Sequence, residues 1–166
     1  MKRLYLVGGP MGVGKTAVCR CLQRRLERSV FLDGDWCWDA NPLQVTEETK
    51  AMVLDNIVHV LNNFLRCSAY DHVIFCWVLH RWEIWEDLLS RLDTEACAVT
   101  KAALVCAPEV LRARVEADAA AGLRAPDAAA RSLVYLPLYD ALNVRKLDTT
   151  ALTPEETASA LLEAMG

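Results

Sequence analysis

Short apolar runs alternate with longer amphipathic segments along the chain. The short runs are rich in Val, Leu, Ile and Phe and show little alternation between polar and apolar positions. This pattern is typical of strands that are buried on both faces. It predicts strands at Arg3–Val7, Val30–Asp33, His72–Leu79, Ala102–Cys106 and Val144–Asp148.

The longer segments have the 3.6-residue period of helices. They predict helices near Lys15–Arg28, Glu47–Arg66, Arg81–Arg91, Pro108–Ala120 and Asp127–Leu136. A last helix is indicated by "TPEE" from Thr153, which supplies an N-cap, a proline at the first helical position and a capping glutamate. Strands that alternate with helices in this way favour an α/β domain, with a mainly parallel five-stranded sheet and helices on both faces.

The length and composition of the chain restrict what it can be. Its 166 residues fit one domain, 1–166, without an internal repeat or a linker. A net charge of -4 argues against a nucleic-acid-binding surface, which is normally basic. No apolar run reaches the roughly 18 residues that a membrane span needs. The N-terminal "MKRLYLVGG" lacks a small-residue cleavage site, so we interpret it as a strand and not as a signal peptide.

The seven cysteines do not have the spacing of a metal site. Cys19 and Cys21 lie two apart in a predicted helix, and therefore face different directions. Cys76 and Cys106 lie in apolar runs, where cysteine behaves as a small hydrophobic residue. Without a C-x-x-C pair or a secretion signal, we expect reduced thiols and a cytoplasmic protein.

The segment "GPMGVGKT" matches the phosphate-binding P-loop pattern G-x-x-x-x-G-K-[ST], and it follows the first predicted strand and opens the first helix. Its glycines let backbone N–H groups curl around a phosphate, and the helix N-terminus adds partial positive charge. Lys15 is expected to reach the β- and γ-phosphates, and Thr16 to offer its hydroxyl to Mg²⁺. The residues expected to bind the nucleotide are Gly9, Pro10, Met11, Gly12, Val13, Gly14, Lys15, Thr16 and Ala17.

Several missing signatures narrow the class of P-loop protein. The chain has no N-K-x-D motif, which removes the ordinary GTPases, and it is too short for the added lobes of motors and large ATPases. The third predicted strand reads "VIFCWVL" and continues into His80 instead of an acidic residue. A small-molecule kinase fits what remains.

At this point "GGPMGVGKT" together with "LDGD" resembles the small P-loop kinases of the nucleoside-monophosphate-kinase-like group. Adenylylsulfate kinases carry a similar "LDGD", gluconate and shikimate kinases have an Asp at the same point, and chloramphenicol phosphotransferase and tunicamycin-resistance proteins are further relatives of this kind. The resemblance covers the whole chain in outline and implies a three-layer P-loop NTPase fold with a small helical lid. It also implies that Asp33 or Asp35 holds the acceptor hydroxyl, accepts its proton, or binds Mg²⁺ through water.

The position of these two carboxylates supports such a role independently. A carboxylate at the end of a strand beside the P-loop strand points into the crevice where open α/β sheets bind ligands. Phosphoryl transfer needs one carboxylate to orient the incoming hydroxyl. The alternative is that Asp33 and Asp35 form a turn around Gly34. The two interpretations are compatible.

The tryptophans depart from the adenylylsulfate kinase pattern, which continues "LDGD" with Asn and Arg, whereas this chain continues "WCWD". Five tryptophans between positions 36 and 85 are suited to line a pocket for a ring-containing acceptor. Trp82 and Trp85, three apart on one helical face, are expected in the core instead. The predicted acceptor-binding residues are Asp35, Trp36, Trp38, Trp77, His80 and Arg81.

The alanine-rich segment "LRARVEADAAAGLRAPDAAAR" is predicted to contain the lid, approximately residues 117–132. In the kinases that it resembles, a lid closes over the triphosphate and supplies arginines that neutralise developing charge. Arg124 and Arg131 are the candidates for this role, and the resemblance makes Arg114 a candidate for stacking on the adenine. The alternative is that these arginines belong to solvated helix faces.

These observations predict an ATP- and Mg²⁺-dependent phosphotransferase that modifies a hydroxyl of a small ring-containing molecule such as a sugar, nucleoside or antibiotic. Lys15, Asp33, Asp35, Arg124 and Arg131 are its predicted catalytic residues, and Thr16 is its predicted metal ligand. The alternative is an ATP-binding regulatory module with little or no transferase activity. We expect a small-molecule acceptor and neither nucleic acid nor membrane as partners, and the sequence leaves monomer and homodimer open.

Overall fold

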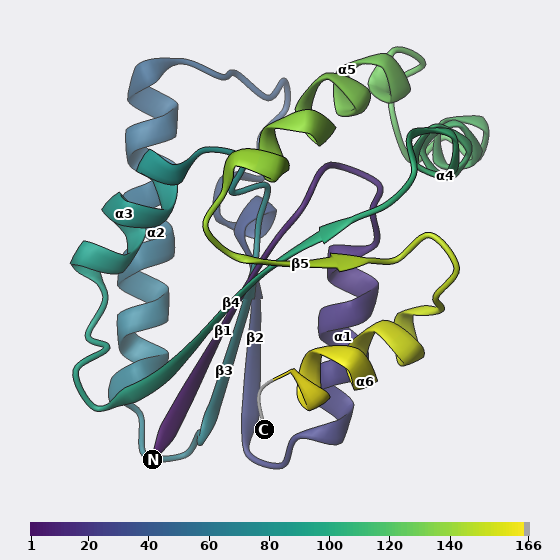
Figure 1. Ribbon diagram of the computed structural model, residues 1–166. Coiled ribbons are helices and arrows are strands. Elements are labelled where there is room, and N and C mark those ends of the chain that lie inside the picture. Colours follow the sequence, from purple (N-terminus) through teal and green to yellow (C-terminus); the bar gives the residue numbers. More distant parts are fainter. Residues whose placement is uncertain (165–166) are drawn as a thin grey trace.

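A parallel five-stranded sheet with the strand order β2-β3-β1-β4-β5 forms the centre of the computed structural model, which describes residues 1–164 (Figure 1). All neighbouring strands run parallel, as the alternation of strands and helices requires. The strands are β1 (Lys2–Gly8), β2 (Ser29–Asp33), β3 (His72–Cys76), β4 (Cys97–Val105) and β5 (Arg145–Asp148).

Within residues 1–164, six α-helices and two short 3-10 helices connect and follow the strands. The α-helices are α1 (Lys15–Arg25), α2 (Glu47–Arg66), α3 (Trp82–Arg91), α4 (Pro108–Ala120), α5 (Ala128–Tyr135) and α6 (Pro154–Glu163). The 3-10 helices are η1 (Gly34–Trp38) and η2 (Leu136–Ala141). Thr153 caps α6 through the capping box that the sequence predicts, with its side chain accepting from the N–H of Glu156.

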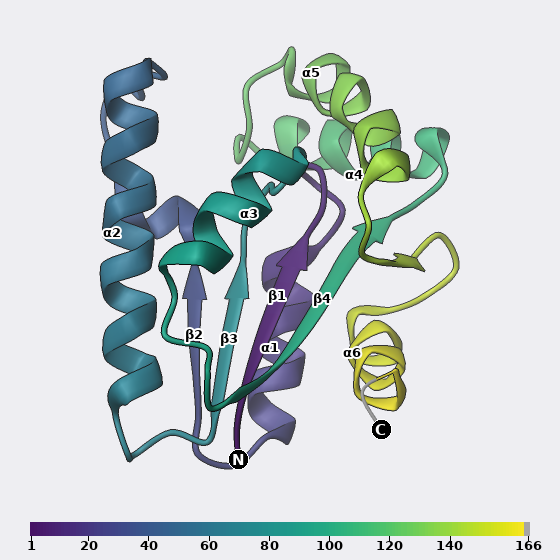
Figure 2. The same cartoon turned by 60° about the vertical axis from the view of Figure 1, so that its left-hand side comes forward.

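Helices cover both faces of the sheet, so the domain has three layers (Figures 1 and 2). On one face, α1 and α6 pack Leu22 and Leu161 against Tyr5 and Val7 of β1. On the other face, α2 and α3 pack against Leu4 and its neighbours. Successive residues of β1 thus enter opposite cores, which explains why its sequence is apolar throughout.

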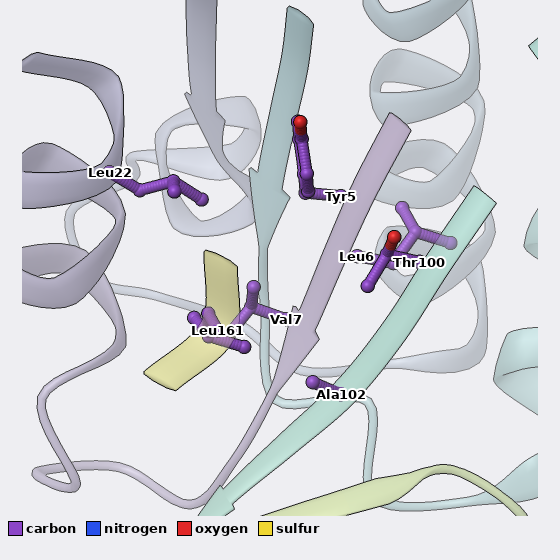
Figure 3. A pocket seen from close by; sticks show the side chains of 7 residues that line it. All are labelled: Tyr5, Leu6, Val7, Leu22, Thr100, Ala102 and Leu161. Carbon is purple, nitrogen blue, oxygen red and sulfur yellow. The ribbon is translucent and has the colours of Figure 1, made fainter. Parts of the chain in front are cut away.

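Figure 3 shows a gap within the first of these cores, between β1, β4, α1 and α6. The gap has essentially no volume for a water-sized molecule, and apolar side chains dominate its lining. It is therefore part of the packed interior and not a ligand site. Its lining residues are Tyr5, Leu6, Val7, Leu22, Thr100, Ala102 and Leu161.

The helices α4 and α5 lie over the carboxyl ends of the strands (Figures 1 and 2). Leu111 and Val115 of α4 and Ala128 and Ala129 of α5 are buried in the same core as α1. The lid that the sequence predicts is thus attached to the domain by apolar packing, and it stands beside the edge of the sheet where parallel α/β folds bind ligands.

The ends of some elements differ from their predicted positions. Strand β3 stops at Cys76 and not at Leu79, because the chain turns at Leu79, which has a φ of 41° and whose carbonyl accepts a hydrogen bond from Trp85 Nε1. Strand β4 starts at Cys97, five residues before the predicted start, where it pairs with Lys2 of β1. Nothing in the apolar pattern indicated η1 or η2.

All seven cysteines are free thiols. Residues 1–164 contain no cluster of three or more His, Cys, Asp or Glu side chains that would hold a metal ion. Among the helices described, none combines the length and the apolar character that crossing a bilayer demands.

Candidate active site

The P-loop connects β1 to α1 at the carboxyl edge of the sheet. Gly12 and Gly14 have φ angles of 83° and 104°, which an L side chain rarely adopts, so glycine is required at both positions. Gly14 is also the residue that precedes the first turn of α1. The loop therefore exposes backbone N–H groups at a helix N-terminus, which is the geometry of a phosphate site.

Lys15 lies over this loop and is held by it. Its Nζ donates hydrogen bonds to the carbonyl oxygens of Gly9 at 2.8 Å and Pro10 at 2.9 Å. Burial lowers the pKa of Lys15 from its ordinary value, and the carboxylates of Asp33 and Asp35 act against this shift. A partly desolvated ammonium group favours an anionic partner such as a phosphate.

Asp33 contacts the P-loop directly. Thr16 Oγ1 donates a hydrogen bond to Asp33 Oδ2 at 2.6 Å, and Asp33 Oδ1 accepts from the N–H of Asp35 at 3.0 Å. Only 6% of Asp33 is exposed. A hydroxyl and a carboxylate are hard oxygen ligands of the kind that Mg²⁺ prefers, so this pair fits a Mg²⁺ bound next to a triphosphate.

Asp35 is held from the opposite side. Its Oδ1 accepts a hydrogen bond of 3.1 Å from Trp77 Nε1, and Trp77 follows the end of β3. The ring of Trp77 packs on Gly34, which separates the two carboxylates in the sequence. The "DGD" segment is thus a turn that places its two carboxylates on different sides, with Asp33 bonded to the P-loop and Asp35 bonded to Trp77.

One cleft of about 1790 Å³ joins these groups. This volume exceeds the roughly 300–1,000 Å³ of a site for one small ligand, so the cleft has room for two. Most of the predicted site residues line it, namely Met11, Gly12, Val13, Gly14, Lys15, Thr16, Ala17, Asp33, Asp35, Trp38, Trp77, His80, Arg81, Arg114, Arg124 and Arg131. Gly9 and Pro10 do not, although their carbonyls hold Lys15.

Trp36 also lies outside the lining of the cleft, unlike the other residues predicted to bind the acceptor. Its ring meets Phe31 edge-on at 5.2 Å, and the guanidinium of Arg20 lies 5.0 Å from its centroid. The 3-10 turn of η1 is the reason, because it turns Trp36 toward α1. Trp38, in contrast, meets Trp77 edge-on at 6.1 Å inside the cleft. Trp85 is fully buried, as expected, whereas Trp82 is only partly buried.

His80 and Arg81 line the cleft where the chain leaves β3. The imidazole of His80 packs edge-on against Tyr135 of α5, with 4.7 Å between ring centroids. Its Nδ1 is buried and has no hydrogen-bond partner among the residues that the structure describes. Burial lowers the pKa of His80, and the charges of Arg81 and Lys50 lower it further, so the ring is neutral at neutral pH.

The three predicted arginines have different partners. Arg114 donates to the carbonyls of Val13 and Thr149, at 3.2 and 2.9 Å, and so connects α4 to the P-loop and to the segment after β5. Arg124 pairs with Asp118 at 2.9 Å and Arg131 with Asp127 at 3.1 Å. These two pairs are partly exposed and therefore weak, so a phosphate is able to compete for either arginine.

Sequence reasoning missed a group of residues that line the same cleft: Asp39, Leu43, Val45, Glu47, Lys50, Leu54, Glu83, Ile84, Val134 and Tyr135. Most of them lie on helix faces or in loops, where their residue types are ordinary. The available signal was "NPLQV", which places Leu43 and Val45 in a loop where apolar side chains are uncommon. Both are more than half exposed.

Comparison with known proteins agrees with this geometry. A family model described as an AAA domain matches residues 6–123. The structure of the Deinococcus radiodurans tunicamycin resistance protein superposes with a TM-score of 0.76 at 16% identity, over 100% of this chain and 96% of its own. A gluconokinase from Sinorhizobium meliloti 1021 reaches 0.70 at 15% identity, over 98% and 93% of the two chains.

The APS kinase of Mycobacterium tuberculosis, solved with AMPPNP and APS, reaches a TM-score of 0.67 at 16% identity over 98% of this chain and 96% of its own. No curated protein matches the chain in sequence. At these identities the solved structures show a shared fold. They confirm the predicted three-layer P-loop architecture and the resemblance to small P-loop kinases.

We expect Gly34→Ala to destabilise the protein, because a Cβ at this position would lie 2.5 Å from Cγ of Trp77. The ring must move to accept the methyl group, and overpacking of this kind costs about 1–3 kcal/mol of the free energy of unfolding. Urea denaturation followed by circular dichroism measures the loss.

The control for Gly34→Ala is the same substitution in a Trp77→Ala background, which removes the ring atoms that would lie 2.5 and 2.6 Å from the new methyl group and leaves only Cβ of residue 77, at 2.9 Å. We expect the added cost to be clearly smaller there, because the flat ring no longer has to move. An equal cost in both backgrounds would show that the clash with Trp77 is not the reason.

Proposed function

The chain belongs to the AAA domain family, and from this premise and the geometry of the cleft we propose that it is an ATP- and Mg²⁺-dependent kinase that phosphorylates a hydroxyl of a small ring-containing molecule. The observation that carries the proposal is the division of the "DGD" carboxylates. Asp33 bonds to the P-loop threonine, and Asp35 bonds to a tryptophan on the other side of the same cleft. A passive nucleotide-binding module needs no second carboxylate beside an aromatic wall.

The donor half of the cleft suits a nucleoside triphosphate. The backbone N–H groups of the P-loop and the N-terminus of α1 would bind the phosphate oxygens, and Lys15 would exchange its carbonyl partners for the β- and γ-phosphates. Thr16 and Asp33 would hold Mg²⁺, which when bound neutralises part of the phosphate charge. Arg114 keeps the loop in place from the side of α4.

The acceptor half of the cleft is the part around Asp35, Trp38, Trp77, His80 and Arg81, and it contains the group that would activate the hydroxyl. In the proposed reaction Asp35 accepts the hydroxyl proton while the hydroxyl oxygen bonds to the γ-phosphorus. The bond between that phosphorus and the β–γ bridging oxygen breaks, and ADP leaves with its electron pair. The hydrogen bond from Trp77 orients the Asp35 carboxylate for this role.

The lid would supply positive charge to the transferred group. Arg124 and Arg131 both line the cleft, and each has a weak carboxylate partner that a phosphate can replace. Solved structures described as a gluconokinase, a sugar kinase and a shikimate kinase share this architecture, which supports a kinase activity. The net charge of -4 supports a free small molecule over a nucleic acid as the acceptor.

Incubation of the protein with γ-labelled ATP, Mg²⁺ and a fractionated metabolite mixture, supplemented with sugars, nucleosides and antibiotics, tests the activity. We expect a labelled small molecule, resolved by mass, whose formation falls at least about 100-fold in a Lys15→Ala variant that is folded by circular dichroism. Label that stays on ATP or appears only as inorganic phosphate would favour the ATP-binding regulatory module.

The two carboxylates are expected to give different kinetic defects. Asp35→Asn should lower kcat by roughly 10²- to 10⁴-fold and leave the affinity for ATP unchanged, because only proton transfer from the acceptor is lost. Asp33→Asn should instead raise the Mg²⁺ concentration needed for half-maximal rate. Steady-state kinetics with varied ATP and Mg²⁺ separate the two, and interchanged phenotypes would assign the base to Asp33.

Substitution of the lid arginines should affect the transition state more than the binding of ATP. We expect Arg124→Ala and Arg131→Ala each to lower kcat on the order of 10²-fold with little change in the KM for ATP. Arg112→Ala is the matched control, since Arg112 is an exposed arginine of α4 that does not line the cleft. Full activity of both lid variants would show that Arg124 and Arg131 belong to solvated helix faces and take no part in transfer.

A further inference from the structure

The chemistry of the acceptor half allows a narrower description of the acceptor, which rests on the proposed function. The walls of this half next to Asp35 are aromatic, since Trp77 bonds to the carboxylate and Trp38 packs edge-on against Trp77. A hydroxyl held by Asp35 would therefore have its own carbon skeleton against indole rings. Such walls favour a ring over a flexible polyol chain.

The apolar lining continues to the mouth of the cleft. Leu43 and Val45, in the loop before α2, and Val134 and Tyr135, on α5, all line the cleft and are all exposed. Val134 is 72% exposed and Val45 is 58% exposed. Single exposed apolar residues scattered over a surface are ordinary. Exposed apolar side chains that cluster at one cleft indicate a binding surface for an apolar ligand.

The charges of this half oppose an anionic acceptor. Four carboxylates line it, those of Asp35, Asp39, Glu47 and Glu83, against the two cations Lys50 and Arg81. The exposed pair between Lys50 and Glu47 is weak, and Arg81 forms no ion pair within residues 1–164, but the carboxylates still outnumber these two cations. A carboxylate, sulfate or phosphate on the acceptor would meet more negative than positive charge in a partly desolvated cleft.

His80 adds a polar atom without adding charge. Its imidazole packs edge-on against Tyr135 in the same cleft as Trp38 and Trp77, and burial lowers its pKa, so it is neutral at neutral pH. It would meet a hydroxyl or an amide of the acceptor, and it would not provide the positive charge that an acid requires.

We propose that the acceptor is an uncharged alcohol that carries an apolar ring system, and that the cleft selects against the anionic acceptors that similar folds phosphorylate or bind, such as gluconate, shikimate or a sulfated nucleotide. The hydroxyl lies at Asp35, the ring against Trp38 and Trp77, and further apolar substituents between Val45 and Val134. The apolar ring of such an acceptor would pack on the aromatic walls, and its lack of charge would avoid repulsion by the carboxylates.

Three matched probes test the proposal by binding alone, with the protein in the presence and absence of Mg²⁺ and a non-hydrolysable ATP analogue. They are phenyl β-glucoside, phenyl β-glucuronide, which replaces one CH₂OH by a carboxylate, and methyl β-glucoside, which lacks the aryl group. We expect the quenching of tryptophan fluorescence and calorimetry to give the phenyl glucoside at least about tenfold higher affinity than either of the others.

Variants of the cleft identify the cause of the selectivity. Val134→Ser should weaken phenyl glucoside several-fold and leave binding of the ATP analogue unchanged, whereas Leu138→Ser, an exposed apolar residue outside the lining, should change neither. Asp39→Asn should narrow the gap between the glucuronide and the glucoside, because it removes one repelling charge.

Equal or tighter binding of the glucuronide, equal binding of the methyl glucoside, or no aryl binding up to 10-millimolar concentrations, about the weakest affinity of interest, would each overturn the inference. Because these measurements need no turnover, they are independent of the transfer assay. Selective binding of the phenyl glucoside without any Lys15-dependent transfer would contradict the proposed kinase activity and support the proposed binding preference. Lys15-dependent transfer to an anionic acceptor would support the kinase activity and contradict the preference for an uncharged acceptor.

Discussion

The hydrogen bond between Thr16 and Asp33 is the contact on which the arrangement of the site depends. It joins the first turn of α1 to the end of β2, although β3 lies between β2 and β1 in the sheet. Parallel strands place all their carboxyl ends at one edge, so two segments far apart in the sequence meet there without long connecting loops. The short turn at Gly34 then fixes where Asp35 and the aromatic wall lie relative to the phosphate loop.

Much of the fold was predictable because its signals are local. The helices at Glu47–Arg66 and Pro108–Ala120 have the bounds that their periodicity predicts, and the P-loop pattern located the loop between β1 and α1 that lines the cleft. The apolar runs also identified all five strands. These features depend on residue spacing within a single element, which the sequence displays directly.

What the sequence left out depends on contacts between elements. The end of β3 is set by the Trp85 indole bonding to Leu79, and the turn of η1 carries Trp36 away from the cleft while Trp38 stays within it. The apolar mouth consists of residues from a loop and from α5 that are unremarkable separately. Only the tertiary arrangement brings them to one cleft, so no local pattern was able to reveal them.

The contact between Gly12 and α4 has a consequence for how the lid can move. A Cβ on Gly12 would lie 2.3 Å from Cγ2 of Val115, and Arg114 ties the same helix to the carbonyl of Val13. Helix α4 is therefore packed tightly against the P-loop. Any closing motion is therefore expected to pivot beyond it, near Gly122, whose φ is 75° and whose Cβ position has no neighbouring atom within 4 Å. The P-loop of this molecule is thus braced from the side by α4, and its shape does not depend on the rest of the lid.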